Sequence, residues 1–196
     1  PDDTRIFMIS GRYEHDNKGI DLFLDALGQV NRDLAKSQTC LLALCAVMGG
    51  HSGVNPDAVS GDADKQPPYG PNWLSSHYVY NPAQDPIITS CLRLGLDNGP
   101  EDRVQVIFVP ALLDGEDGFF NMPYNEVLSA CDLGVFPPWY EPWGYTPQES
   151  AAYAVPTITS DLAGFGLWVR EQNGQGHGVD IINRSQTSYE NSVAAL

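Results

Sequence analysis

Two glutamates, Glu141 and Glu149, stand eight positions apart on either side of a short turn, in the stretch WYEPWGYTPQESAA of residues 139–152. After the turn, Thr146, Pro147 and Glu149 have the residue types of a helix N-cap, a first helical residue and the third residue of a capping box, so a helix is expected to start here. A helix N-terminus attracts anions, because it presents unpaired N–H groups and the positive end of the helix dipole. The stretch therefore predicts a phosphate site flanked by two carboxylates.

Two basic side chains, Arg12 and Lys18, lie in the loop GRYEHDNKG, which follows the first apolar run of the chain. A guanidinium and an ammonium aimed at a helix N-terminus would hold a diphosphate from two sides. The alternative is that both pair at the surface with Glu14, Asp16 or Asp21. The loop lacks the glycines of a dinucleotide-binding or Walker pattern, so the spacing alone leaves both interpretations open.

Each acid of the turn also has a structural interpretation. Glu149 could hydrogen-bond back to the backbone at Thr146 as part of the capping box, which is worth about 1 kcal/mol, and spacing alone favours this role. Glu141 lies in a loop that needs no charge for folding, although a surface pair with a basic neighbour is left open. Trp143 and Tyr145 could be core aromatics, but their positions around Gly144 place both on the turn.

The periodicity of apolar residues predicts the strands and helices that these loops connect. Short apolar runs predict strands at 5–10, 40–48, 104–109, 133–136, 155–159 and 179–182. Helices are expected over 19–36, 86–96, 123–131 and 147–153, with weaker ones at 167–172 and within 185–196. This alternation predicts one α/β domain with a doubly wound parallel sheet, whose ligands bind beyond the carboxyl ends of the strands. Residues 49–81, rich in Gly, Pro, Asp and Ser, are expected to form a partly mobile surface excursion within it.

The amino-acid composition excludes several classes of binding partner. The net charge of −15 with only ten Lys and Arg argues against nucleic acid or an anionic membrane. The four cysteines show no C-x-x-C spacing, so free thiols in the cytoplasm are expected. No apolar run approaches the roughly 20 residues of a membrane span. The acidic turn at 114–118 does not match a calcium loop, so no metal is expected. The abrupt start at Pro1 suggests a domain of a longer protein.

The sequence of the turn and of its flanks resembles that of a known enzyme family. YEPWGYTPQE resembles the E-x(7)-E signature of retaining GT-B glycosyltransferases, and GRYEHDNKG resembles their Arg/Lys diphosphate loop. The segments FPPWYEPWGYTPQESAAYAVPTITSDLAGFG, SHYVYNPAQDPIITSCLRLGL and DRVQVIFVPALL are similar to glycogen synthases of the animal and fungal type. The similarity runs from about Ile6 to Gly166. It implies the C-terminal, Rossmann-like half of a GT-B fold, which binds the nucleotide-sugar donor.

The resemblance implies a role for each matched residue. Arg12 and Lys18 would hold the donor diphosphate, and the catalytic Glu141 would lie near the anomeric carbon of glucose. Further donor contacts would come from Tyr124 to the uracil, from the backbone of Trp143, Gly144, Tyr145 and Thr146 to sugar hydroxyls and phosphate, and from Glu149 to the ribose. For Glu149 this reverses the cap interpretation.

The implied activity is retaining transfer of glucose from UDP-glucose or ADP-glucose to the non-reducing end of an α-1,4-glucan, without a metal cofactor. The glucan acceptor would bind through an N-terminal domain outside residues 1–196, so the fragment alone is expected to be inactive. The short segment 49–76 replaces a long helical insert of the family, so a similar tetramer is doubtful and an oligomer is left open. The alternatives are a non-catalytic nucleotide-sugar or glucan-binding module and another retaining GT-B glycosyltransferase.

Overall fold

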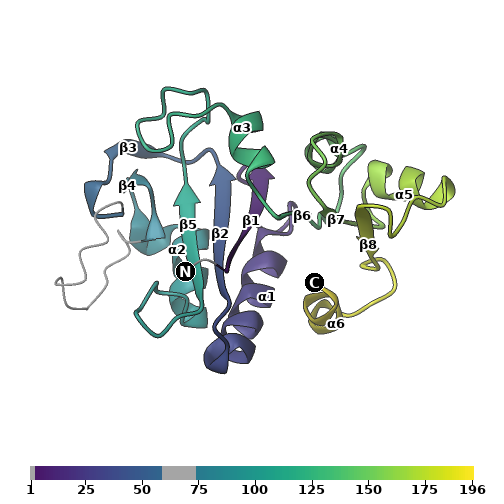
Figure 1. Ribbon diagram of the computed structural model, residues 1–196, viewed down its shortest axis with the longest axis horizontal. Coiled ribbons are helices and arrows are strands. Elements are labelled where there is room, and N and C mark those ends of the chain that lie inside the picture. The colour runs from purple at the N-terminus through teal and green to yellow at the C-terminus, as the bar shows by residue number, and fades with distance from the viewer. Residues whose placement is uncertain (1–2, 59–73) are drawn as a thin grey trace.

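The computed structural model describes residues 3–58 and 74–196. Its centre is a six-stranded parallel sheet (Figure 1), made of β1 Thr4–Gly11, β2 Cys40–Val47, β5 Val104–Val109, β6 Leu133–Phe136, β7 Thr157–Ser160 and β8 Val179–Ile182. The strand order is β5-β2-β1-β6-β7-β8, so the chain winds one way from β1 to β5 and the other way from β6 to β8. The expected doubly wound sheet is confirmed, with its switch point between β1 and β6.

Helices cover both faces of this sheet. They are α1 Ile20–Asp33, α2 Pro86–Leu94, α3 Tyr124–Ser129, α4 Tyr145–Ala152, α5 Gly164–Glu171 and α6 Tyr189–Ala195, with short 3-10 helices at Leu34–Lys36, Pro56–Ala58 and Pro82–Gln84. Neighbouring residues of a strand point to opposite faces. Accordingly, Ile9 of β1 joins a core with Phe23 of α1 and Ile87 of α2, whereas Met8 joins a core with Val127 of α3.

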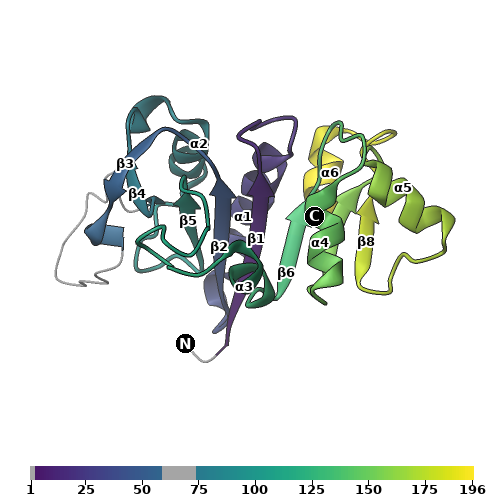
Figure 2. The same ribbon diagram turned by 90° about the horizontal axis from the view of Figure 1, so that it is seen from above.

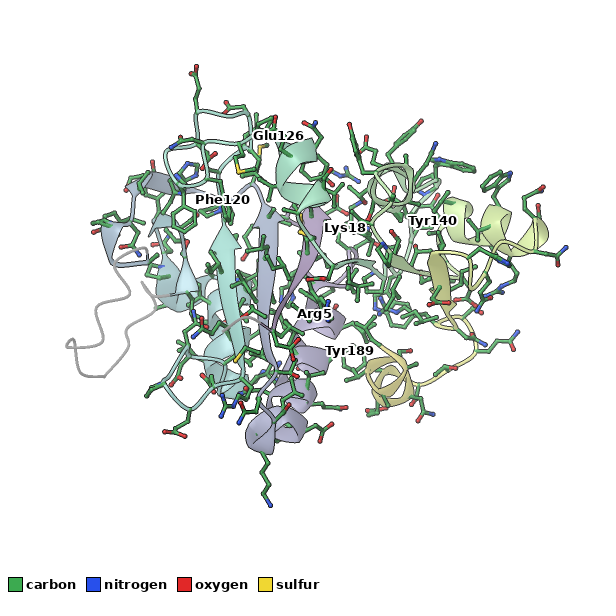
Figure 3. All side chains as sticks on the ribbon, viewed as in Figure 1. Arg5, Lys18, Phe120, Glu126, Tyr140 and Tyr189 are labelled. Carbon is green, nitrogen blue, oxygen red and sulfur yellow. The ribbon has the colours of Figure 1, made fainter. Side chains whose placement is uncertain are left out.

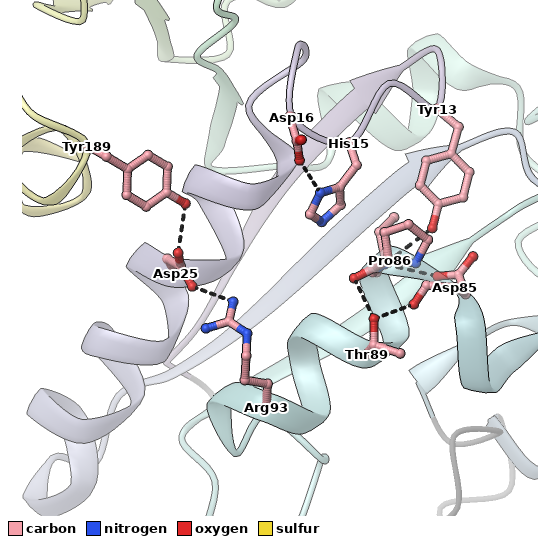
Figure 4. Close-up of polar contacts among 10 residues, drawn as sticks. Tyr13, His15, Asp16, Asp25, Asp85, Pro86, Thr89, Arg93 and Tyr189 are labelled. Carbon is pink, nitrogen blue, oxygen red and sulfur yellow. Dashed lines mark hydrogen bonds and ion pairs between the residues drawn. The ribbon is translucent and has the colours of Figure 1, made fainter.

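Polar contacts tie the helices of one face together. The carboxylate of Asp25 on α1 accepts a hydrogen bond from Arg93 of α2 at 2.9 Å and another from the hydroxyl of Tyr189 on α6 at 2.7 Å (Figure 4). At the other end of α2, Asp85 caps the helix by accepting from the backbone N–H groups of Ile87 and Ile88. The contacts of Asp25 thus link α1, α2 and α6 on this face of the sheet.

β1 does not pair equally with its two neighbours. It pairs with β2 along its whole length, from Thr4 and Cys40 to Gly11 and Val47. With β6 it makes ladder pairs only at Phe7 and Met8 within the described residues. The loops that follow β1 and β6 lie at the same end of the sheet (Figure 2), where the N–H of Trp139 donates to the carbonyl of Asn17 at 2.8 Å.

β7 and α5 start at other residues than the periodicity predicts. The strand expected from residue 155 begins at Thr157, because the N–H of Val155 donates to Ser150 at the end of α4 and Pro156 has no N–H. The helix expected from residue 167 begins at Gly164. Glycine is a poor helix former in isolation, but a Cβ on Gly164 would lie 2.2 Å from the carbonyl oxygen of Pro142, so close packing demands glycine there.

The segment 49–81 holds more regular structure than was expected. Within it, β3 His51–Val54 and β4 His77–Val79 pair antiparallel. Residues 74–77 are buried, and the Nε2 of His77 donates to the backbone carbonyl of Asp117 at 2.9 Å. Strands of four and three residues are too short to show a period in the sequence. Residues 59–73, the middle of the expected excursion, lie outside the described residues.

Candidate functional site

A cavity of about 550 Å³ lies beyond the carboxyl ends of β1 and β2 and beside the start of α4. Its volume is in the range that holds a nucleotide-sized ligand. Four of the predicted donor-binding residues line it, namely Arg12, Tyr124, Thr146 and Glu149. The cavity is also lined by the apolar residues Ala46, Met48, Ala111, Leu112 and Leu113.

A second, narrower cavity adjoins the first, because Ser10 and Thr146 line both. Lys18, Glu141 and Gly144 line this smaller space. The structure therefore places Arg12, Tyr124 and Glu149 at the larger cavity, Lys18, Glu141 and Gly144 at the smaller one, and Thr146 at both. The larger one has the size and apolar wall that suit a nucleoside, and the smaller one holds the cation and the carboxylate.

Lys18 and Glu141 form an ion pair between the loops that follow β1 and β6. The two side chains are only 16% and 19% exposed, so the pair is much better shielded from water than a surface ion pair. Lys18 lies between the β1 side and the α4 side of the molecule (Figure 3). The surface pairing considered for the two basic residues is thus wrong for Lys18.

For Arg12 the surface pairing is present. Its guanidinium lies 3.1 Å from the carboxylate of Glu14 and is 74% exposed. Because an exposed ion pair is worth little, Arg12 can exchange this partner for another anion at small cost. Arg12 also lines the larger cavity, so both interpretations of this residue are compatible with its position.

α4 begins at Tyr145, two residues earlier than the capping box predicts, and no side chain caps it. The predicted capping box of Thr146 and Glu149 is wrong. Gly144 is the N-cap residue, and its left-handed backbone with φ of 105° turns the chain into the helix. Pro147 then falls in the first turn, where a missing N–H removes no intrahelical bond. Glu149 is left exposed at the larger cavity.

The start of α4 borders both cavities, since Thr146 lines each. The first N–H groups of a helix have no acceptor within the helix, and the dipole adds positive potential there. The predicted anion-attracting helix end is therefore placed against the cavities, together with Arg12 and Lys18.

The side chains of Trp143 and Tyr145 line neither of these two cavities. The indole of Trp143 packs against Phe165 and Trp168, and its Nε1 donates to the side chain of Gln148 at 2.5 Å. Tyr145 is exposed. Any contact of these two residues with a ligand in the cavities would come from the backbone, which is the kind of contact that the resemblance implies.

Ser10 lines both cavities, and its hydroxyl meets that of Tyr124, which lines the larger one. The Tyr124 hydroxyl and the Ser10 hydroxyl share a hydrogen bond of 2.9 Å, and burial raises the pKa of Tyr124. Ser10 was not singled out from the sequence. Its signal was its position, because it ends the first apolar run directly before Gly11, at the carboxyl end of a strand.

The part of the chain that the structure describes has neither a cluster of metal-binding side chains nor a membrane-spanning helix. No three His, Cys, Asp or Glu side chains gather there in a way that could hold a metal ion. No helix in residues 3–58 and 74–196 has the length and apolar character needed to cross a membrane.

Comparisons with known proteins identify relatives of this chain. A family model described as glycogen synthase matches residues 64–196. The chain is 28% identical to the glycogen [starch] synthase of Neurospora crassa, over all of this chain and 36% of that protein. It is also 28% identical to the liver glycogen [starch] synthase of Mus musculus, over 98% of this chain and 35% of that protein. The chain thus spans about a third of the length of these relatives.

Solved structures share the fold. WaaG, a glycosyltransferase involved in lipopolysaccharide biosynthesis, superposes with a TM-score of 0.54 at 16% identity, over 99% of this chain and 37% of that one. A UDP-forming trehalose-phosphate synthase from Burkholderia xenovorans gives 0.56 at 13% identity, over 98% and 36%. At such low identity these superpositions show the fold alone. They confirm the expected Rossmann-like half of a GT-B fold. Since the family model covers most of the sequence, the chain belongs to the glycogen synthase family.

Proposed function

We propose that residues 1–196 form the donor-binding domain of a hexosyltransferase of the glycogen synthase type. The enzyme transfers glucose from UDP-glucose or ADP-glucose to the non-reducing end of an α-1,4-glucan, with retention at the anomeric carbon. The observation that carries the proposal is the pairing of Lys18 with Glu141 beside a nucleotide-sized cavity at the switch point. The glucan binds a domain outside this chain, so residues 1–196 alone bind donor without turning it over.

The positive groups of the site would stabilise the leaving diphosphate. In glycosyl transfer from a nucleotide donor, negative charge grows on the diphosphate as the bond to the sugar breaks. Fixed positive potential at that place lowers the barrier. Arg12, Lys18 and the N-terminus of α4, which together border the two cavities, supply it, and no metal ion takes part in the proposed reaction.

Glu141 would face the sugar. It lines the narrow cavity with Gly144, next to the cation that would take the diphosphate. A carboxylate there stabilises the positive charge that develops on the sugar ring in an oxocarbenium-like transition state. When the diphosphate takes the ammonium of Lys18, the carboxylate of Glu141 is released to do so.

The nucleoside would occupy the larger cavity. The ring of Tyr124 and the apolar wall with Met48 and Leu112 suit the faces of a base. The carboxylate of Glu149, free of the cap, suits the ribose hydroxyls. We also propose a cytoplasmic location, which the four free cysteines support.

Calorimetry with UDP and ADP tests donor binding by residues 1–196. We expect saturable heat at millimolar nucleotide, and Arg12→Ala and Lys18→Ala each should weaken the Kd by roughly 10- to 100-fold, as expected for a lost hydrogen bond to a charged group. Arg93→Ala is the matched control, because Arg93 pairs with Asp25 between α1 and α2. A folded sample that gives no heat with either nucleotide would count against the site.

Product analysis on the full-length protein tests the reaction. Labelled UDP-glucose and ADP-glucose are supplied side by side with glycogen. Incorporation of label into α-1,4-linked glucose supports the proposal and names the preferred donor. Transfer to a different acceptor would instead identify another retaining glycosyltransferase, and binding without transfer would identify a non-catalytic module.

A further inference from the structure

Arg184 is a buried arginine that follows β8 and is only 2% exposed. Its guanidinium reaches the segment that follows β6. Nη1 donates a hydrogen bond to the backbone carbonyl of Pro137, and the guanidinium carbon lies 4.0 Å from the ring centroid of Trp139. Arg184 therefore touches the segment 137–139, which leads directly to Glu141.

Burial of the charged Arg184 side chain at this place carries a desolvation penalty. Burial lowers the pKa of Arg184, while the nearby carboxylate of Asp21 raises it. Nε and Nη2 are buried without a hydrogen-bond partner among the described residues. An apolar side chain would avoid this desolvation cost. A charged group buried at such a cost is typical of a functional role.

Residues 137–139 also contact the loop that carries Lys18. A Cβ on Gly19 would lie 2.1 Å from the carbonyl oxygen of Pro137, so the loop that carries Lys18 packs directly on the carbonyl that Arg184 binds. The N–H of Trp139 donates to the carbonyl of Asn17 at 2.8 Å. A displacement of residues 137–139 would therefore move Glu141 relative to Lys18.

We infer that Arg184 is a positioning residue, which holds the segment 137–139 and thereby sets the place of Glu141 at the site. Arg184 lines neither of the two cavities, so it acts on the donor only through this segment. This inference rests on the proposed function, because it assigns a role relative to the reacting sugar.

The test is steady-state kinetics of the full-length enzyme with Arg184→Met and Arg184→Lys. We expect kcat to fall about 100-fold in Arg184→Met, because a misplacement of about 1 Å at a reacting group costs that much. The KM for the donor should stay within about threefold, since Arg12 and the larger cavity are untouched. Arg184→Lys should recover part of kcat, because an ammonium can still donate to Pro137 but cannot stack on Trp139.

A second pair of variants guards against misfolding of Arg184→Met. Trp139 is 41% exposed, so changing it should leave the fold intact. Trp139→Leu removes the aromatic face beneath the guanidinium and should lower kcat by roughly tenfold, whereas Trp139→Phe keeps a face and should stay close to wild type. Arg93→Met, which removes an arginine from a pair on α2, is the matched control.

The outcomes separate the two claims. If the wild type is active and a folded Arg184→Met keeps its kcat, or changes only the KM, the positioning role is refuted while the proposed function stands. Equal effects of Trp139→Leu and Trp139→Phe would also refute it. A wild type without transfer activity would defeat the proposed function, and the positioning role would fall with it.

Discussion

Lys18 and Glu141 form an ion pair in the structure, but the proposed reaction requires each of them to contact the donor instead. In the structure each neutralises the other in a largely shielded place. In the proposed reaction they must separate, because the ammonium goes to the diphosphate and the carboxylate to the sugar. A charge left alone in such a place is costly, so a ligand that brings its own negative charge is favoured over an empty separation of the pair.

A double-mutant cycle measures this coupling at the residue scale. We expect Lys18→Met and Glu141→Gln each to lower the free energy of unfolding by on the order of 1 kcal/mol, because each leaves the other charge without its partner. The double variant should lose less than the sum of the two. Urea denaturation of the four proteins gives the values, and additive losses would show that the pair is not coupled.

At the scale of elements, the start of α5 supports the turn that carries Glu141. The N–H of Gly164 donates to the carbonyl of Glu141 at 3.1 Å, and the N–H of Phe165 donates to that of Trp143 at 2.7 Å. The N–H of Glu141 in turn donates to Leu162. These bonds set the backbone of the turn from outside, so its geometry depends on how closely α5 approaches.

Gly164→Ala tests this dependence, since its Cβ would lie 2.2 Å from the carbonyl oxygen of Pro142. We expect a loss of about 1–3 kcal/mol in the free energy of unfolding, as for overpacked cores, together with weaker UDP binding. Gly53→Ala is the matched control, because a Cβ there meets nothing within 4 Å and the φ of Gly53 is ordinary. Equal stability of the two variants, from thermal unfolding, would contradict the close approach.

At the scale of the whole molecule, one carboxylate links the segments that follow the last two strands of the sheet, β7 and β8. Asp161, which follows β7, accepts hydrogen bonds from the N–H groups of Arg184 at 2.8 Å and Ser185 at 3.1 Å, beyond β8. Burial alone would raise the pKa of Asp161, but the bonds from the Ser185 hydroxyl and from these N–H groups outweigh it, and the pKa is lowered. The ionised carboxylate therefore stabilises the fold.

This gives a pH dependence with a defined sign. The folded pKa of Asp161 lies below its usual value of 3.8, so its contribution is fully present above that value and is lost as the pH falls through the folded pKa. Asp161→Asn should lower the Tm at pH 7. The difference from wild type should shrink below roughly pH 4. A difference that stays constant down to acidic pH would rule out the ionised form as its source.

Local spacing along the chain predicted much of this protein. The strands at 104–109, 133–136 and 179–182 have the expected bounds, because runs of apolar residues report burial directly. The doubly wound sheet followed from the alternation of elements. The motif around Glu141 carried a resemblance to the family that the comparisons then established. Short strands such as β3 and β4 escaped, because three or four residues show no period.

By itself, the sequence determined which segments form most of the strands and helices and to which family they belong, since both follow from residue types at fixed spacings. Only the tertiary structure decided which side chains meet at the switch point. Lys18 pairs with Glu141 rather than with the nearer acids, Arg184 lies against the segment before Glu141, and Glu149 is free of the cap. The physical reason is that sheet order and close packing against glycines bring together residues that lie far apart along the chain.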